Sequence, residues 1–251
     1  MLPPVPGDPN PGLDRVGYEL RADGIKSTPN PLRSGIHSRG YLPHVKREGA
    51  AYFVTFRLAD ALPKEVLLQF ERERAERLRL LEDAVRQGWD TKDSEDEICR
   101  DLQRKIERYL DQGHGACHLL RPEVAELVAN SLLWFEGQRY LLSHWVIMPN
   151  HVHAVVWPMP NHLLSHILRS WKQYTSVRAK RIVAMGEEHL WQRESFDHWI
   201  RDDAEKARIC RYIEFNPVSA RLCTRPEDWP WSSACPAWSA TNRHGGCDRT
   251  S

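Results

Sequence analysis

The chain has 251 residues, of which 41% are hydrophobic and 27% are charged, so it is long enough and apolar enough to bury a core. Its formal net charge of +1 gives no overall attraction to nucleic acid, so a nucleic-acid function would require a local concentration of basic residues. No apolar run approaches the roughly 20 residues of a membrane span, and the first residues lack a signal-peptide pattern, which predicts a cytoplasmic protein without membrane contact.

The chain changes in composition near residue 45, which separates a leader from the main domain. Residues 1–45 are rich in proline, glycine and polar residues without periodicity, which predicts a flexible leader. Residues 46–185 are expected to form the main domain, starting with a mostly apolar alternating run at residues 52–58 that is typical of a central strand. Six scattered cysteines without a C-x-x-C pair argue against a zinc ribbon or a disulfide framework.

A change of composition marks residues 63–112 as an insertion in this domain. Two highly charged helical patterns occur there, and they are separated by Gly88-Trp89-Asp90. We expect a helical hairpin. Its charge runs are interpreted as solvated helix faces and not as a binding surface, because that is the usual role of such runs.

The next elements follow an alternating order. A helix is predicted from Pro122 to Gly137, followed by a β-hairpin whose strands meet at Pro149-Asn150. The tetrapeptide Met-Pro-Asn-His at 148–151 recurs at 159–162, where Asn161 is predicted to cap a second helix. With a fourth strand near residues 191–200, the order predicts an α+β, ferredoxin-like domain with an antiparallel sheet.

The C-terminal region is expected to elaborate the same domain. Residues 186–240 should supply this strand, a helical extension over residues 202–222 and a tail, and residues 241–251 should be disordered. The extension carries three basic residues, Arg208, Arg211 and Arg221, which are either solvated charges or DNA contacts. Trp229 and Trp231 either anchor the tail or stack on unpaired bases.

The first copy of the repeated tetrapeptide continues into a second histidine, so His151 and His153 stand two apart on a predicted strand. Such side chains point to the same face with Cα atoms about 6.6 Å apart, so both imidazoles could bind one metal ion. The alternative is that they are ordinary histidines at the edge of the core.

Tyr174 lies on the helix that follows the histidine strand. It shares an apolar face with Trp171, which favours a buried core tyrosine. The same helix is unusually basic, however, with Arg169, Lys172, Arg178, Lys180 and Arg181. A phenol is a poor nucleophile at neutral pH, and attack on a phosphodiester would need a bound cation and cationic side chains nearby.

Five motifs in order resemble those of the REP-associated tyrosine transposases, which are single-tyrosine relatives of the HUH (His-hydrophobic-His) transposases. The motifs are WVIMPNHVHAVVWP, LLSHILRSWKQYTSVRAKRI, LWQRESFDHWIRD, RYIEFNPVSARL and PEDWPWSSA. The resemblance implies a ferredoxin-like HUH domain that cleaves and joins single-stranded DNA. It further implies that His151 and His153 hold Mg²⁺ or Mn²⁺ and that Tyr174 forms a 5′-phosphotyrosine.

The resemblance also implies the partner, which is a single-stranded DNA hairpin of the repetitive extragenic palindrome type. The basic residues Arg169, Lys172, Arg178, Lys180, Arg181 and Arg211 are then expected to bind DNA. A nucleoid-associated cytoplasmic location and a monomer or homodimer are consistent with such a role. If Tyr174 is not the nucleophile, Tyr212 is the next candidate, because it lies in the motif RYIEFNPVSARL.

The sequence departs from the family at one position. In related transposases an amide four residues after the tyrosine completes the metal shell, and Arg178 occupies that place here. Arginine cannot bind a metal ion, so the third ligand remains open among Gln192, Glu194, Asp197 and His198. Imidazoles in general suit zinc better than magnesium, and only the family favours the harder ion.

Two other classes of function remain open from the sequence. One is a metal-dependent hydrolase of small molecules that uses the histidine pair and a carboxylate such as Glu194, with Tyr174 as a structural residue. The other is a domesticated protein that binds DNA hairpins without cutting them, in which Arg178 marks a decayed site.

Overall fold

The computed structural model describes residues 35–38, 43–46, 50–89, 95–186 and 188–238. The centre of the fold is a four-stranded antiparallel sheet with the spatial order β4-β5-β3-β6. Its strands are β3 (Tyr52–Arg57), β4 (Tyr140–Ile147), β5 (His151–Pro158) and β6 (Phe196–Trp199). Apart from the two inserted helices of residues 64–110, one α-helix lies between β3 and the β4-β5 hairpin and another before β6, which is the ferredoxin-like α+β arrangement that the sequence predicts.

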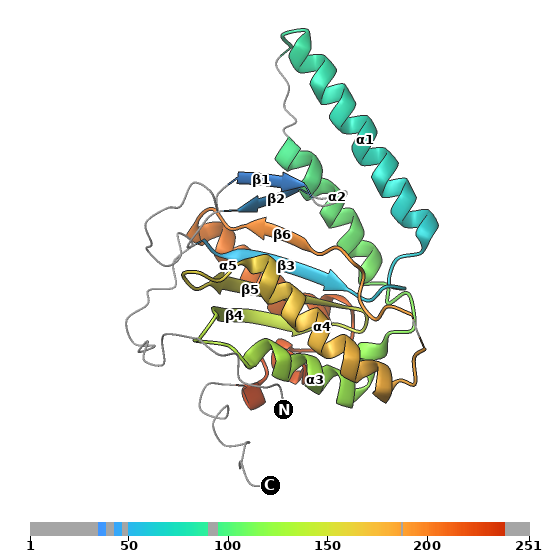
Figure 1. Ribbon diagram of the computed structural model, residues 1–251, viewed down its shortest axis with the longest axis vertical. Coiled ribbons are helices and arrows are strands. Elements are labelled where there is room, and N and C mark those ends of the chain that lie inside the picture. The colour runs from blue at the N-terminus through green and yellow to red at the C-terminus, as the bar shows by residue number, and fades with distance from the viewer. Residues whose placement is uncertain (1–34, 39–42, 47–49, 90–94, 187, 239–251) are drawn as a thin grey trace.

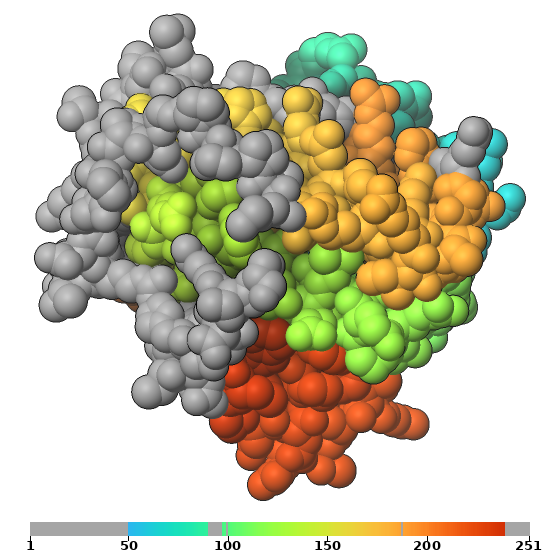
Figure 2. All heavy atoms as spheres, turned by 60° about the horizontal axis from the view of Figure 1, so that its bottom comes forward, coloured from blue at the N-terminus to red at the C-terminus, as the bar shows by residue number. Residues whose placement is uncertain are grey.

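Helices cover both faces of the sheet, and they divide its side chains into two sets. Helices α3 (Pro122–Leu133) and α4 (Leu164–Ile182) lie on one face, and α5 (Asp203–Ser219) lies on the other (Figure 1). Because neighbouring strand residues point to opposite faces, Val54 and Phe56 pack toward α4, while Phe53 packs toward α5. Figure 2 shows the molecule from the side where α3 (green) and α4 (yellow to orange) lie next to each other.

The two central strands are buried on both faces. Every residue of β3 is buried, and β5 is buried from His151 to Trp157. Phe56 contacts the rings of Trp171 on α4 and Trp191 before β6, so the core of this face is largely aromatic. The sheet therefore offers the histidines of β5 a dry environment and not an exposed edge.

The inserted hairpin consists of α1 (Lys64–Arg86) and α2 (Glu95–Leu110), as predicted. Its two helices differ in their surroundings. Helix α1 has no buried residue, whereas α2 buries an apolar stripe of Ile98, Leu102, Ile106 and Leu110. The charge runs lie on solvated faces in both helices, as with Arg104 and Arg108 of α2, but α2 also packs onto the domain with its apolar stripe.

Part of the predicted leader is ordered. Strands β1 (Gly35–Ser38) and β2 (Pro43–Lys46) form an antiparallel pair, and β2 lies against β6. The prediction of a flexible leader is therefore wrong for residues 35–38 and 43–45, which together with Lys46 add a hairpin beside the sheet. Residues 1–34 and the predicted disordered tail at 241–251 lie outside the described residues.

Two helix boundaries differ from the prediction. Asn161 does not cap α4. It adopts a left-handed conformation in the preceding turn, and Leu163 occupies the N-cap position. Helix α5 continues through Pro217 to Ser219, because a proline in the last turn removes only one helical hydrogen bond. Single-turn helices occur at His118–Leu120, Pro226–Asp228 and Pro236–Trp238.

The cysteines that the structure describes in detail, namely Cys117, Cys210, Cys223 and Cys235, are free thiols. Among the described helices, none combines the length and the apolar character needed to cross a membrane.

The asymmetry of the inserted hairpin leads to a stability prediction. Ile106→Ala removes a side chain that is only 1% exposed, so it should lower the free energy of unfolding by about 2–5 kcal/mol. Leu80→Ala in α1 removes a side chain that is 54% exposed and should change it by less than about 0.5 kcal/mol. Urea denaturation measures both. Equal effects would show that α2 is not part of the folded domain.

Candidate functional site

His151 and His153 lie on the sheet face that packs against α5. They alternate along β5 with Val152 and Ala154, which point to the opposite face toward α4. Both imidazoles are fully buried, and their ring centroids are 4.6 Å apart. The sequence prediction that the two rings share one face is confirmed, but the rings lie inside the protein and not at the edge of its core.

Asn150 fixes the orientation of His151. Its Nδ2 donates to the backbone oxygens of Leu110 at 3.2 Å and His114 at 2.9 Å, so its Oδ1 must act as an acceptor. That Oδ1 lies 2.7 Å from His151 Nδ1, which must therefore donate the proton. The lone pair of His151 is then on Nε2, which faces Asp111 and has no hydrogen-bond partner among the described residues.

His153 is held in a similar way. Its Nδ1 lies 2.8 Å from Thr55 Oγ1, and its Nε2 lies 3.4 Å from the Tyr212 hydroxyl. Burial, together with the nearby Arg57 guanidinium, lowers the pKa of His151 to about 3. Burial and the neighbouring His151 hold the pKa of His153 well below its usual value. Both rings are therefore neutral near pH 7, which is the state that binds metal ions.

Helix α5 brings a phenol and an amide to the histidines. Tyr212 and Asn216 are one helical turn apart, so they project from the same side of the helix. The ring centroids of Tyr212 and His153 are 5.3 Å apart. Asn216 is 1% exposed and lies beside Asp111 and Tyr212, yet its amide makes no hydrogen bond of normal geometry to any described residue.

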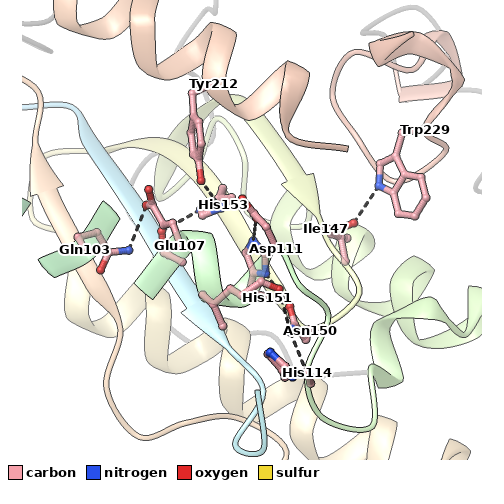
Figure 3. A network of polar contacts seen from close by, with 12 residues as sticks. Gln103, Glu107, Asp111, His114, Ile147, Asn150, His151, His153, Tyr212 and Trp229 are labelled. Atoms are coloured by element: carbon pink, nitrogen blue, oxygen red, sulfur yellow. Dashed lines mark hydrogen bonds and ion pairs between the residues drawn. The ribbon is translucent and has the colours of Figure 1, made fainter. Parts of the chain in front are cut away.

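Helix α2 supplies Gln103 and the carboxylate of Glu107, and a second carboxylate, Asp111, follows directly after its last residue. Figure 3 shows Gln103 and Glu107 on α2 and Tyr212 pointing down from α5 toward His153. Burial raises the pKa of Glu107 to about 7, although the hydrogen bond from Gln103 and the nearby Tyr212 hydroxyl oppose this shift. Burial also raises the pKa of Asp111 to about 6, although the nearby Asn216 amide opposes this shift.

The same acidic surroundings act on the phenol. Burial raises the pKa of Tyr212 well above its ordinary value, and the negative charges of Glu107 and Asp111 raise it further. The surroundings therefore favour the uncharged form of Glu107, Asp111 and Tyr212 alike. A cation placed among them would reverse this tendency, because positive charge favours carboxylate and phenolate forms.

The polar atoms that lack partners fit a divalent cation. His151 Nε2 and Asp111 Oδ1 are both buried, lack hydrogen bonds among the described residues and lie 3.9 Å apart. Two ligand atoms that each bind Mg²⁺ at about 2.1 Å can be at most about 4.2 Å apart, so an ion fits between them. Asn216 Oδ1 is a third such atom. Among the described residues, no group of three or more His, Cys, Asp or Glu side chains is by itself placed to hold a metal ion.

The structure does not bring Tyr174 to the histidines. Its helix, α4, packs on the opposite face of the sheet, where Trp171 and Ala179 join the other apolar cluster. The Arg178 guanidinium covers the Tyr174 ring at 3.9 Å. The expectation that this phenol stands beside the histidine pair is therefore wrong, because the sheet separates them.

The basic residues of α4 share this location. Lys172 donates to the Arg193 backbone oxygen and to Ser195 Oγ, and burial lowers its pKa to about 8. Arg169 and Arg181 are exposed on α4, while Lys180 is half-buried. Their predicted role in DNA binding stays a prediction, but they do not flank the histidines. Arg211 does lie on the histidine side, next to Tyr212 on α5, and it is exposed.

The predicted third ligands are also elsewhere. His198 pairs with Glu205 at 3.0 Å, and Glu194 lies beside Lys172. Asp197 alternates with Phe196 and so points away from the histidine face, while the Gln192 backbone bonds to Arg57. Sequence reasoning missed Asp111, Glu107 and Asn216. The sequence did contain a signal for Asn216. This amide stands four residues after Tyr212, and the family spacing from tyrosine to amide was considered only from Tyr174.

The raised pKa of Glu107 leads to a pH prediction. In the unfolded chain this pKa is 4.5, and in the folded chain it is about 7. Between these values the folded chain retains a proton that the unfolded chain has lost, so stability falls as pH rises through this range. In chelator at pH 8, Glu107→Gln should therefore raise the free energy of unfolding by about 1–3 kcal/mol.

Urea denaturation at pH 5 and pH 8 measures this effect. The gain should shrink toward pH 5, where Glu107 is protonated in the folded chain. Glu123→Gln, which alters an exposed carboxylate on α3, is the control and should change little at either pH. A destabilised Glu107→Gln variant at pH 8 would contradict the assigned burial.

Parts of this chain are similar to known transposases. Residues 123–216 match the sequence family described as IS200-like transposases. The REP-associated tyrosine transposase of Escherichia coli K12 is 28% identical over 92 residues, which cover 37% of this chain and 53% of that protein. A Haemophilus influenzae protein provisionally named in the same way is 29% identical over 96 residues, which cover 35% of this chain and 54% of that protein. The chain spans about half the length of the curated relatives it matches.

A solved structure of a REP-associated tyrosine transposase bound to a REP hairpin aligns with 78% of this chain and 80% of that chain, at 16% identity and a TM-score of 0.44. The matched family segment begins in α3, includes both histidines and Tyr212, and ends at Asn216, so it leaves out α1 and α2. The sequence matches confirm the resemblance that the motifs predicted: residues 123–216 are similar to the IS200-like transposases, and part of the chain is similar to REP-associated tyrosine transposases.

Proposed function

We propose that the protein is a transposase-type enzyme that cleaves and rejoins single-stranded DNA, with Tyr212 as the nucleophile. The observation that carries the proposal is the position of the Tyr212 hydroxyl, 3.4 Å from Nε2 of a buried, neutral histidine of the His-Val-His pair. Tyr174 is not proposed again, because the sheet separates its helix from these histidines.

His151, His153, Asp111 and Asn216 are the residues that would hold Mg²⁺ or Mn²⁺. A bound divalent cation would polarise the phosphodiester and stabilise negative charge that develops during cleavage. The protein's own contribution is orientation. Asn150 and Thr55 fix the two rings, and these outer hydrogen bonds keep both Nε2 atoms directed into the site. The surrounding sheet face excludes water, which strengthens electrostatic interactions there.

In the proposed reaction the Tyr212 oxygen attacks phosphorus and forms a covalent 5′-phosphotyrosine, while the bond to the 3′-oxygen breaks. The free 3′-hydroxyl can later attack this ester, which rejoins a strand and releases the phenol. A covalent intermediate conserves the energy of the phosphodiester bond, so joining needs no external energy source. This property distinguishes a strand transferase from a hydrolase, in which water would leave two free ends.

The proposed partner is a DNA hairpin with a single-stranded flank, which is the type of ligand named for the structural relative. Arg211 precedes Tyr212 on α5 and is exposed, so it can contact a phosphate near the site. Arg211→Ala should weaken binding of a hairpin oligonucleotide several-fold in a gel-shift assay. Arg181→Ala on α4 is the control. A larger loss in the control would place the DNA on the α4 face.

The nucleophile can be identified with a labelled hairpin oligonucleotide. Tyr212→Phe removes one hydroxyl and keeps the ring, so it should abolish both cleavage and the covalent adduct on denaturing gels. Its stability should change by about 1 kcal/mol, the usual net contribution of one hydrogen bond. Tyr174→Phe is the matched control and should still form the adduct. An adduct that survives in Tyr212→Phe and disappears in Tyr174→Phe would overturn the assignment.

Cleavage without any adduct in the unaltered protein would favour the hydrolase reading. Hairpin binding without cleavage would favour the domesticated DNA-binding protein. The same gels distinguish all three outcomes. The label is retained on the protein for a transferase, appears on a free shortened strand for a hydrolase, and stays on the intact strand for a DNA-binding protein.

A further inference from the structure

Helix α2 carries two parallel rows of polar side chains, and the first of them faces the site. This site row consists of Gln103, Glu107 and Asp111, which Figure 3 shows near the histidines. Asp111 Oδ1 lies 3.9 Å from His151 Nε2, and the Asp111 amide makes a helical hydrogen bond of 2.9 Å to the Glu107 backbone oxygen. The site row therefore stays on one side of the helix up to the histidines.

The second row is basic. This arginine row consists of residues four apart, namely Arg100, Arg104 and Arg108. Arg104 and Arg108 each come one residue after a member of the site row, which turns them by about 100° around the helix, away from its buried apolar stripe. The Arg104 side chain is 70% exposed, and Arg108 is also exposed. The arginine row is thus the border of the site row on the solvent side.

The acidic neighbour of the arginine row offsets only part of its charge. Asp101 Oδ1 lies 3.5 Å from Arg104, but its other oxygen lies 2.7 Å from Arg77 of α1, so two arginines share one carboxylate. Arg108 donates from Nε to the backbone oxygen of Arg104, which carries no negative charge. The row therefore remains positive beside the site, in a protein whose net charge is only +1.

We infer that the arginine row binds the phosphate backbone of the single strand that reaches Tyr212. The inference rests on the proposed function, because it takes that strand as the partner. The row extends over eight residues, which is about 12 Å along the helix axis and long enough to meet two successive phosphates. A guanidinium also presents paired donors that match the oxygens of a phosphate.

Helix α5 carries basic character on its own exposed side. Arg211 precedes Tyr212, and its guanidinium lies 5.5 Å from the ring centre of Phe215, which is also exposed. Arginines of two helices therefore border the residues of the site. In the proposed reaction one strand is bound covalently after cleavage, but the strand with the free 3′-hydroxyl must be retained without a bond until joining. Backbone contacts from α2 would help to retain it.

The sequence similarity to known transposases does not account for the arginine row. The matched family segment covers residues 123–216 and leaves out α2. The exposed arginines of α1, such as Arg72 and Arg79, belong to the same insertion, but they lie on the helix that contributes no residue to the site row. They provide a matched control for the charge of α2.

The first test measures binding of a hairpin oligonucleotide with a single-stranded flank by fluorescence anisotropy, in chelator so that the strand stays intact. The full-length double variant Arg104→Gln/Arg108→Gln should bind at least about tenfold more weakly at low salt. Its plot of log affinity against log salt should be shallower by about 1.4, because each phosphate contact on a single strand contributes about 0.7. Arg72→Gln/Arg79→Gln, the control, should leave the affinity and the slope nearly unchanged.

A second measurement locates the contact on the DNA. Single phosphates of the flank are replaced in turn by methylphosphonates, each of which removes one negative charge. At a phosphate that the arginine row binds, this replacement should weaken binding by the unaltered protein and should weaken binding by Arg104→Gln/Arg108→Gln much less, because the contact is already lost. Equal effects in both proteins at every position would overturn the inference.

The remaining outcomes separate the inference from the proposed function. If the unaltered protein forms the adduct at Tyr212, and Arg104→Gln/Arg108→Gln binds as tightly with the same salt slope, only the inference fails. An equal loss in the α1 control also overturns it, because general attraction would explain the effect. If the unaltered protein binds through the row but forms no adduct, the proposed cleavage fails and the row remains a DNA contact. Mn²⁺ affinity should be the same in the double variant, and a parallel fall would attribute the loss to a damaged site and overturn the inference.

Discussion

The arrangement of the site depends on one buried side chain, the amide of Asn150. It connects three segments that are distant in sequence, because it binds the last turn of α2, the loop at His114 and the ring of His151. The hydrogen bonds of its Nδ2 leave its Oδ1 only the role of acceptor, which determines the tautomer of His151. A buried amide that lost these partners would cost about 1–3 kcal/mol for each unsatisfied group. The turn of the β-hairpin is therefore also the element that joins the inserted helix to the histidines.

The electrostatics of the site explain why a cation suits it. The sheet and α5 bury two histidines fully and two carboxylates and a phenol in part, and burial opposes the charged form of each. Carboxylates in such surroundings reduce the stability of the folded chain at neutral pH, which is a common cost of a functional site. A divalent cation would bind the atoms that now lack partners and would stabilise the negative charges. Catalytic chemistry and folding stability would then both depend on the same ion.

Local patterns in the sequence predicted much of this fold. The alternation in β3, the Pro149-Asn150 turn and the charged insertion all appear in the structure where they were expected. The side-by-side histidines followed from the two-residue periodicity of a strand. Tyr174 was misplaced because helical periodicity shows that a helix has an apolar face but not which side of the sheet this face covers. The role of α2 was hidden because Glu107 and Asp111 look like solvated charges, and only long-range packing places them beside Tyr212.

We propose that the buried histidines, Asp111 after α2 and Asn216 of α5 form one cation site. Titration of the protein with Mn²⁺, followed by the electron paramagnetic resonance signal of the free ion, tests it without requiring DNA or activity. One ion should bind per chain. His151→Ala removes a ligand atom and Asp111→Asn removes the negative charge of a ligand, so each should weaken binding at least about tenfold, while His198→Ala should not. Binding that is unchanged in Asp111→Asn, or that survives in His151→Ala, would contradict the account.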